Sequence, residues 1–125
     1  MTPQEIFNKS YTLIIAQGVP SRTPDEGFCV YSGPNGTACG VGILLDPDMR
    51  ERVQNLNEGD DTSIMTLATQ YPNHFPDWVH YNVPLLTSIQ QAHDKFHHKF
   101  VPGFKAAMAE VAKHHNLEVP DATAV

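Results

Sequence analysis

Two cysteines flank a predicted turn in the segment "FCVYSGPNGTAC". Cys29 and Cys39 can be small buried side chains, a disulfide, metal ligands or a catalytic thiol. Nine residues separate them, which differs from the short spacing of zinc knuckles. A nucleophilic cysteine also needs a base and an orienting group nearby, and histidines and carboxylates are too common here to discriminate. We expect reduced, buried thiols, and keep metal, redox and nucleophilic roles as alternatives.

The segment "AHDKFHHKF" supplies candidate metal ligands. His93 and His97 are four residues apart, as are Asp94 and His98, so each pair would share a helical face. The segment lacks the glutamate of the H-E-x-x-H motif, so a metalloprotease is not indicated. His93 also falls on an apolar stripe, where the alternative is a hydrogen-bonded core histidine. The metal hypothesis is a zinc site built from Cys29, Cys39, His93 and Asp94.

A third candidate site is the aromatic segment "YPNHFPDWVHY". Its aromatic residues stand between prolines on a polar background, and such rigid anchors are enriched at protein interfaces. The segment reads as a proline-bounded loop, and the alternative is that its aromatic side chains pack beneath this loop. We predict a partner-binding surface made of Tyr71, Phe75, Trp78 and Tyr81.

The elements that would position these residues begin with an N-terminal helix. Thr2 suits the N-cap, Pro3 the first helical position and Glu5 the partner of a capping box, while Gly18 suits the stop. Further helices are expected at about 47–54 and 62–71, from 83 or 84 to 96, and over 104–115. Pro102 and Gly103 would separate the last two, and Asn116 would end the chain's last helix.

The cysteines themselves are placed by a predicted β-hairpin. In "SGPNGT", Pro34 and Asn35 suit the two central positions of a type I turn, and Gly36 suits the left-handed residue that closes it. That turn would pair Gly33 with Thr37, Tyr31 with Cys39, and Cys29 with Val41, with both thiols on one face. The expected fold class is therefore α+β: one hairpin packed on four to five α-helices, in a single domain over 1–117 with a frayed tail at 118–125.

Composition limits the classes of function. The chain has 125 residues and a formal net charge of -6, which provides no basic stripe for nucleic acid. Its N-terminus lacks the basic and apolar regions of a signal peptide, and no apolar run is long enough to span a membrane. We expect a cytoplasmic protein that binds neither nucleic acid nor membrane.

The chain resembles a family of small bacterial and phage proteins. The resemblance rests on "TPQEIF" at 2–7, on the cysteine segment through "DPD" at 29–48, on "EG" at 58–59 and on the "LLTSIQQAHD" segment at 85–94. Relatives often carry a further cysteine near Ile43, which is absent here. The resemblance implies a cytoplasmic protein of phage or prophage origin and transfers no catalytic residue or cofactor.

The functional expectation is a non-enzymatic accessory protein, without a cofactor, that binds another protein such as a host protein. The alternative from a different class is the metal- or thiol-dependent site of Cys29, Cys39 and His93. A third reading is a self-assembling structural protein, in which an exposed hairpin edge pairs two copies as a homodimer.

Overall fold

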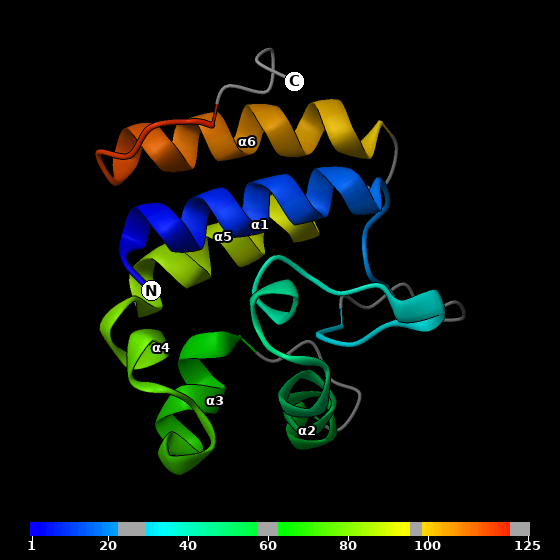
Figure 1. The fold of residues 1–125 in the computed structure, drawn as a ribbon, viewed down its shortest axis with the longest axis vertical. Coiled ribbons are helices and arrows are strands. Elements are labelled where there is room, and N and C mark those ends of the chain that lie inside the picture. The colour runs from blue at the N-terminus through cyan, green and yellow to red at the C-terminus, as the bar shows by residue number, and fades with distance from the viewer. Residues whose placement is uncertain (23–29, 58–62, 96–98, 121–125) are drawn as a thin grey trace.

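The computed structural model describes residues 1–22, 30–57, 63–95 and 99–120 of the chain. These ranges contain helices and no β-strand (Figure 1), so the expected α+β class with a hairpin is wrong: the described part of the chain is all-α. Its α-helices are α1 (Pro3–Gln17), α2 (Pro47–Asn57), α3 (Ile64–Gln70), α4 (Asp77–Tyr81), α5 (Val83–Asp94) and α6 (Phe100–His114). Short 3-10 turns add η1 (Pro34–Gly36), η2 (Gly42–Leu44) and η3 (Pro72–His74).

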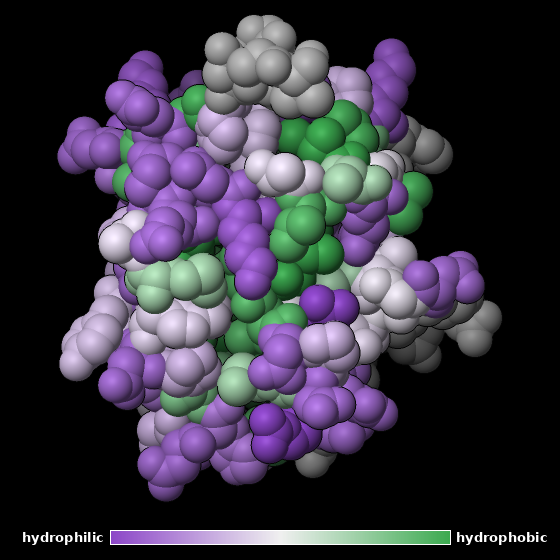
Figure 2. Space-filling view, viewed as in Figure 1, coloured by the Kyte–Doolittle hydropathy of each residue, from purple (hydrophilic) through white to green (hydrophobic). Residues whose placement is uncertain are grey.

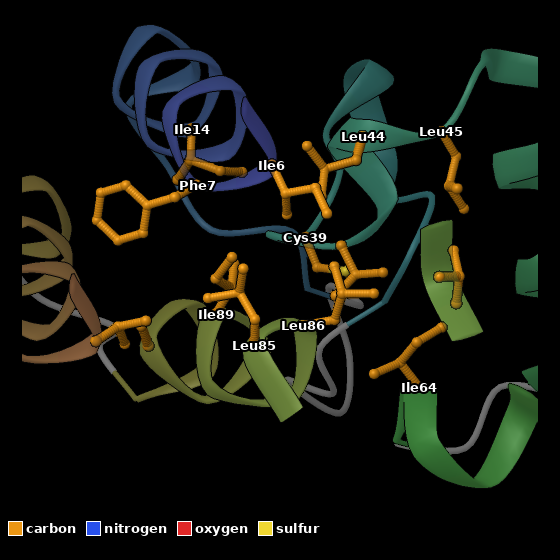
Figure 3. Packing of buried hydrophobic residues seen from close by; sticks show 14 of the residues in the cluster. Ile6, Phe7, Ile14, Cys39, Leu44, Leu45, Ile64, Leu85, Leu86 and Ile89 are labelled. Carbon is orange, nitrogen blue, oxygen red and sulfur yellow. The ribbon is translucent and has the colours of Figure 1, made fainter. Parts of the chain in front are cut away.

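The longest helices, α1, α5 and α6, pack against one another. Figure 1 shows α6 running opposite to α1 and α5, with α2, α3 and α4 on the other side of the molecule. Phe104 of α6 stacks on Phe100 at 5.6 Å between ring centroids and lies 6.4 Å from the ring of Tyr11 in α1. Figure 3 shows another part of this core, which is mostly aliphatic and includes Ile6, Phe7 and Ile14 of α1, Leu44 of η2, Leu85, Leu86 and Ile89 of α5, and Ile64 of α3.

The first helix begins and ends where its sequence predicts. The Thr2 hydroxyl accepts from the Glu5 amide at 3.2 Å, and the Glu5 carboxylate accepts from the Thr2 amide at 3.0 Å, which completes the capping box. The Thr2 amide, which donates to the carboxylate, holds the pKa of Glu5 below its usual range. Gly18 adopts the left-handed conformation that ends the helix, with φ at 78°.

The segment from 30 to 45 contains a turn at the predicted position but no hairpin. The Gly33 amide donates to the Thr37 carbonyl at 2.8 Å, and Gly36 has positive φ, both as expected. Asn35 also has positive φ, at 59°, so the turn is not the predicted type I turn. The pairing of Tyr31 with Cys39 fails, because the Cys39 carbonyl instead accepts from the Ile43 amide at 2.9 Å. The chain therefore coils into η2 after the turn and packs on α1. The predicted pairing of Cys29 with Val41 involves a residue outside the described ranges.

Glutamine side chains form hydrogen bonds to this segment where a hairpin would have used a second strand. Gln17 of α1 donates to the Ala38 carbonyl at 3.0 Å and accepts from the Ala38 amide at 2.9 Å. Gln54 of α2 accepts from the Tyr31 amide at 2.8 Å, and Gln90 of α5 donates to the Tyr31 hydroxyl at 2.8 Å. Because buried backbone groups need partners, the amides of Gln17 and Gln54 allow this irregular segment to lie between helices, and Gln90 adds a contact to a side chain of the segment.

Two glycines let the same segment approach its neighbours closely. A β-carbon at Gly40 would lie 2.7 Å from the Ile89 side chain, and one at Gly42 would collide with the carbonyl oxygen of Tyr31. The Gly40 carbonyl accepts from the buried hydroxyl of Ser10 at 2.7 Å. Close backbone approach therefore explains both glycines without a bound ligand.

The last helix differs from prediction at its start and agrees at its end. Pro102 and Gly103 lie within the first turn of α6 and do not precede it, because a proline is tolerated where helical amides have no partner. Asn116 is left-handed, and the Leu117 amide donates back to the Ala112 carbonyl at 2.8 Å. The backbone of Glu118, where the tail was expected to begin, is hydrogen-bonded to the side chain of Gln4.

Candidate functional site

Cys39 is a free thiol inside the hydrophobic core. Its sulfur accepts from the Gly42 amide at 3.2 Å, and Figure 3 shows the side chain among the buried aliphatic residues. Burial, with a smaller contribution from the charge of Asp94, raises the pKa of the thiol to about 12. A thiolate is the reactive and metal-binding form of cysteine, so this environment disfavours both roles. Cys29 lies outside the described residues.

His93 is completely buried, and both of its ring nitrogens are hydrogen-bonded. The Ser21 amide donates to Nε2 at 3.0 Å, and Nδ1 lies 2.8 Å from the Asp94 carboxylate. Because a backbone amide can only donate, Nε2 is the acceptor and Nδ1 carries the proton given to Asp94. The ring meets Phe100 edge-on, with 5.6 Å between centroids. Neither nitrogen presents a free lone pair to a metal.

The His93 contacts belong to a wider polar network at the end of α5. The Ser21 carbonyl accepts from the Val30 amide at 3.1 Å, and the Arg22 guanidinium donates to the Asp94 carbonyl at 2.6 Å. These bonds hold together segments that are far apart in the sequence. His93 and Asp94 therefore have a structural role, because their hydrogen bonds attach Ser21 and Arg22 to α5, and Ser21 in turn bonds Val30.

No group of three or more histidine, cysteine, aspartate or glutamate side chains is placed to hold a metal ion in the described part of the chain. The zinc hypothesis depends on Cys29, and the helical pairing of His93 and Asp94 depends on His97 and His98. All three of these partners lie outside the described residues. The metal hypothesis thus remains a prediction from sequence, with no geometry in its favour.

A serine and a histidine meet where α5 and the end of α6 come together. Ser88 Oγ lies 3.1 Å from His115 Nε2, and the same hydroxyl donates to the Pro84 carbonyl at 3.1 Å. The hydroxyl has one proton, so His115 Nε2 is the donor to Ser88, the reverse of what a general base requires. Burial, followed by the charge of His114, lowers the pKa of His115. This pair is a helix-to-helix contact.

The predicted partner-binding aromatics separate into packed and exposed residues. Phe75 is buried in the core, while Tyr71 and Trp78 pack against the core and are partly buried. Tyr81, at the end of α4, is 82% exposed. The four residues therefore do not form one surface, and Tyr81 alone among them is presented to solvent as a large side chain.

Tyr81 borders a hollow of about 230 Å³ between three segments of the chain. Its other lining residues come from the start of α1, the α4–α5 junction and the residue after α6: Pro3, Asn82, Pro84, Leu85 and His115. Sequence inspection missed Pro3 and His115 as neighbours of Tyr81. No local signal could have revealed them, because they lie far from Tyr81 along the chain.

Comparisons with models of known families, with curated proteins and with solved structures found no match. Across the described ranges, none of the helices combines the length and the apolar character needed to cross a membrane. The family resemblance noted from the cysteine segment therefore stays a prediction. Function has to be argued from the surface and the geometry of the chain itself.

Proposed function

We propose that this protein is a small accessory protein that acts by binding another protein through Tyr81 and the hollow beside it. The observation that carries the proposal is the 82% exposure of Tyr81, an amphipathic ring held outside the core. Tyrosine is enriched among residues that dominate binding energy, because its ring buries a large area while its hydroxyl forms a hydrogen bond. A phage or prophage origin, with a host protein as partner, is the biological setting that the family resemblance suggests.

Short-range contacts hold the backbone around Tyr81. The Asn82 side chain donates to the Trp78 carbonyl at 2.7 Å, and His80 Nε2 lies 2.9 Å from the Pro72 carbonyl. Tyr71 and His74 meet edge-on at 5.8 Å between ring centroids. A side chain on a backbone held in this way loses less conformational freedom on binding than one on a mobile loop, which favours affinity.

The hollow indicates what the partner would insert. Its lining is about equally apolar, from Pro3, Pro84 and Leu85, and polar, with Asn82 and His115 as hydrogen-bonding groups. A volume of about 230 Å³ suits one or two side chains and is too small for an element of secondary structure. The partner would therefore present a side chain with an apolar body and a hydrogen-bonding group against Tyr81.

Photo-crosslinking tests this proposal directly. We would replace Tyr81 by p-benzoylphenylalanine, express the protein in a bacterial host, irradiate the cells and identify crosslinked products by mass spectrometry. The matched control places the same group at Met65 of α3, which is 55% exposed and does not line the hollow. We expect a discrete product from position 81 that is missing from position 65.

A second measurement distinguishes binding from chance proximity. The wild type should capture the partner that the crosslink identifies. Tyr81→Ala should lose this capture, whereas Met65→Ala should retain it. Equal capture by both variants, or identical crosslinked products from both positions, would show that Tyr81 is not the binding residue.

A further inference from the structure

The outer face of α1 exposes both charged and apolar side chains to solvent. The inner face of this helix is buried. Its opposite face, together with Met1 just before the helix, lines a shallow hollow of about 540 Å³, and the residues of this face are Glu5, Asn8, Lys9, Thr12 and Leu13. Figure 2 shows the side of the molecule on which α1 lies, and hydrophobic surface runs down the middle of it between hydrophilic flanks. Leu13 is 38% exposed although it lies well inside the helix.

The charges on this face are arranged in a self-complementary order. Glu5 and Lys9 carry opposite charges, and no ion pair joins them within the described part of the chain. One oxygen of Glu5 accepts from the Thr2 amide, which leaves its second oxygen for another donor. Exposed apolar residues, Met1 and Leu13, stand on either side of this charged pair.

We propose that this face binds a second copy of the chain, with the two α1 helices antiparallel about a two-fold axis. An axis at the level of position 7 places Glu5 opposite Lys9 of the second copy. Met1 precedes α1, and the same axis brings the N-terminal segment that carries it near Leu13 of the second copy. Two-fold symmetry repeats each contact, so the charged pair and the apolar contact each form twice.

The order of the charges along α1 favours a second copy of the chain as the binding partner. Aligning the helices in parallel would oppose Glu5 to Glu5 and Lys9 to Lys9, whereas the antiparallel arrangement opposes unlike charges throughout. The helical part of the proposed contact runs from Pro3 to Leu13, about 15 Å of helix at the usual rise. Such an interface is small, so we expect weak, concentration-dependent association. This inference is independent of the site at Tyr81.

Sedimentation equilibrium over a range of protein concentrations tests the proposal. We expect the wild type to pass from monomer to dimer as concentration rises, and Lys9→Glu to weaken dimerisation at least about tenfold, because it opposes carboxylates twice. Glu5→Lys should weaken it similarly. An equimolar mixture of the two single variants should form a heterodimer, because every opposed pair then has unlike charges.

The double variant Glu5→Lys/Lys9→Glu tests charge order within one chain. It reverses both charges, so unlike charges again face each other and dimerisation should return. This result matters because Glu5→Lys also removes the capping-box carboxylate and lowers the stability of α1. A stability defect by itself would persist in the double variant.

Leu13→Gln tests the apolar contact, with Met65→Gln on α3 as the matched control. We expect dimerisation to be lost in the first and unchanged in the second. The proposal is overturned by a wild type that stays monomeric at the highest soluble concentration, by a dimer that Lys9→Glu and Leu13→Gln leave unchanged, or by single variants that do not associate when mixed. Tyr81→Ala should leave dimerisation intact, which separates this interface from the proposed partner site.

Discussion

At the scale of single residues, the chemistry-bearing side chains are mostly committed to structure. Cys39 is surrounded by apolar side chains, and His93 uses both nitrogens on Ser21 and Asp94. Each of these groups would have to give up an internal contact before binding a metal or attacking a substrate. The exposed ring of Tyr81 carries no such internal commitment, which is why it carries the functional proposal.

The burial of Cys39 leads to a test of thiol reactivity. In a Cys29→Ser background, we expect the Cys39 thiol to react with a disulfide reagent only when the protein unfolds, because burial raises the pKa of this thiol to about 12. Absorbance of the released thiolate, recorded with and without denaturant, measures the two rates. Labelling of the native protein as fast as labelling of the unfolded protein would contradict this environment for Cys39.

At the scale of elements, side-chain amides replace the hydrogen bonds that a strand would have provided. Gln17 and Gln54 hydrogen-bond backbone groups of the segment between 30 and 45, whereas Gln90 hydrogen-bonds the hydroxyl of a tyrosine side chain in it. Such contacts are specific in geometry, because a carboxamide has both a donor and an acceptor and can match both backbone groups of one residue. The segment is therefore ordered by the helices around it, and its shape depends on their placement.

Gln17→Ala is the sharpest test of this arrangement. The substitution leaves the Ala38 amide and carbonyl without their partners, so we expect a loss of about 1–3 kcal/mol in the free energy of unfolding. Amide hydrogen exchange at Ala38 should accelerate at the same time. Gln91→Ala, on an exposed site of α5, is the control and should change neither quantity measurably. A Gln17→Ala protein as stable as this control would remove the amide contact as an explanation.

At the scale of the whole molecule, one hydrophobic cluster joins the N-terminal helix, the turn segment, the middle helices and α6. It includes Ile6 of α1, Leu44 of η2, Val79 of α4 and Phe104 of α6. Because these elements share their core, none of them has a separate set of buried contacts. Unfolding should therefore be cooperative across the described parts of the chain.

Phe104→Ala tests that cooperativity. Phe104 is completely buried, so the substitution should cost about 3–5 kcal/mol, a large part of the stability of an ordinary domain. Denaturation followed by far-ultraviolet and near-ultraviolet circular dichroism should shift to lower denaturant by the same amount with both probes. Lys105→Ala, at the exposed neighbouring position, is the control. Separate transitions in the two probes would indicate independent folding units.

The sequence by itself determined the features that depend on residues a few positions apart. The capping box of Thr2 and Glu5, the stop at Gly18, the bond from Gly33 to Thr37 and the left-handed Asn116 are all local, and the structure confirms them. The tertiary structure decided how the turn segment continues. A short turn can lead into a hairpin or into a 3-10 coil. Side-chain amides on distant helices stabilise the 3-10 coil here.

The same reason separates the candidate site residues. Cys39, His93, Phe75 and Tyr81 all stand in suggestive local patterns, yet their roles depend on which distant segments cover them. Core contacts bury Cys39, His93 and Phe75. The packing of α1, α5 and α6 leaves Tyr81 exposed, beside the hollow that it lines together with Pro3 and His115. Burial is a property of long-range packing, so only the tertiary structure could assign these roles.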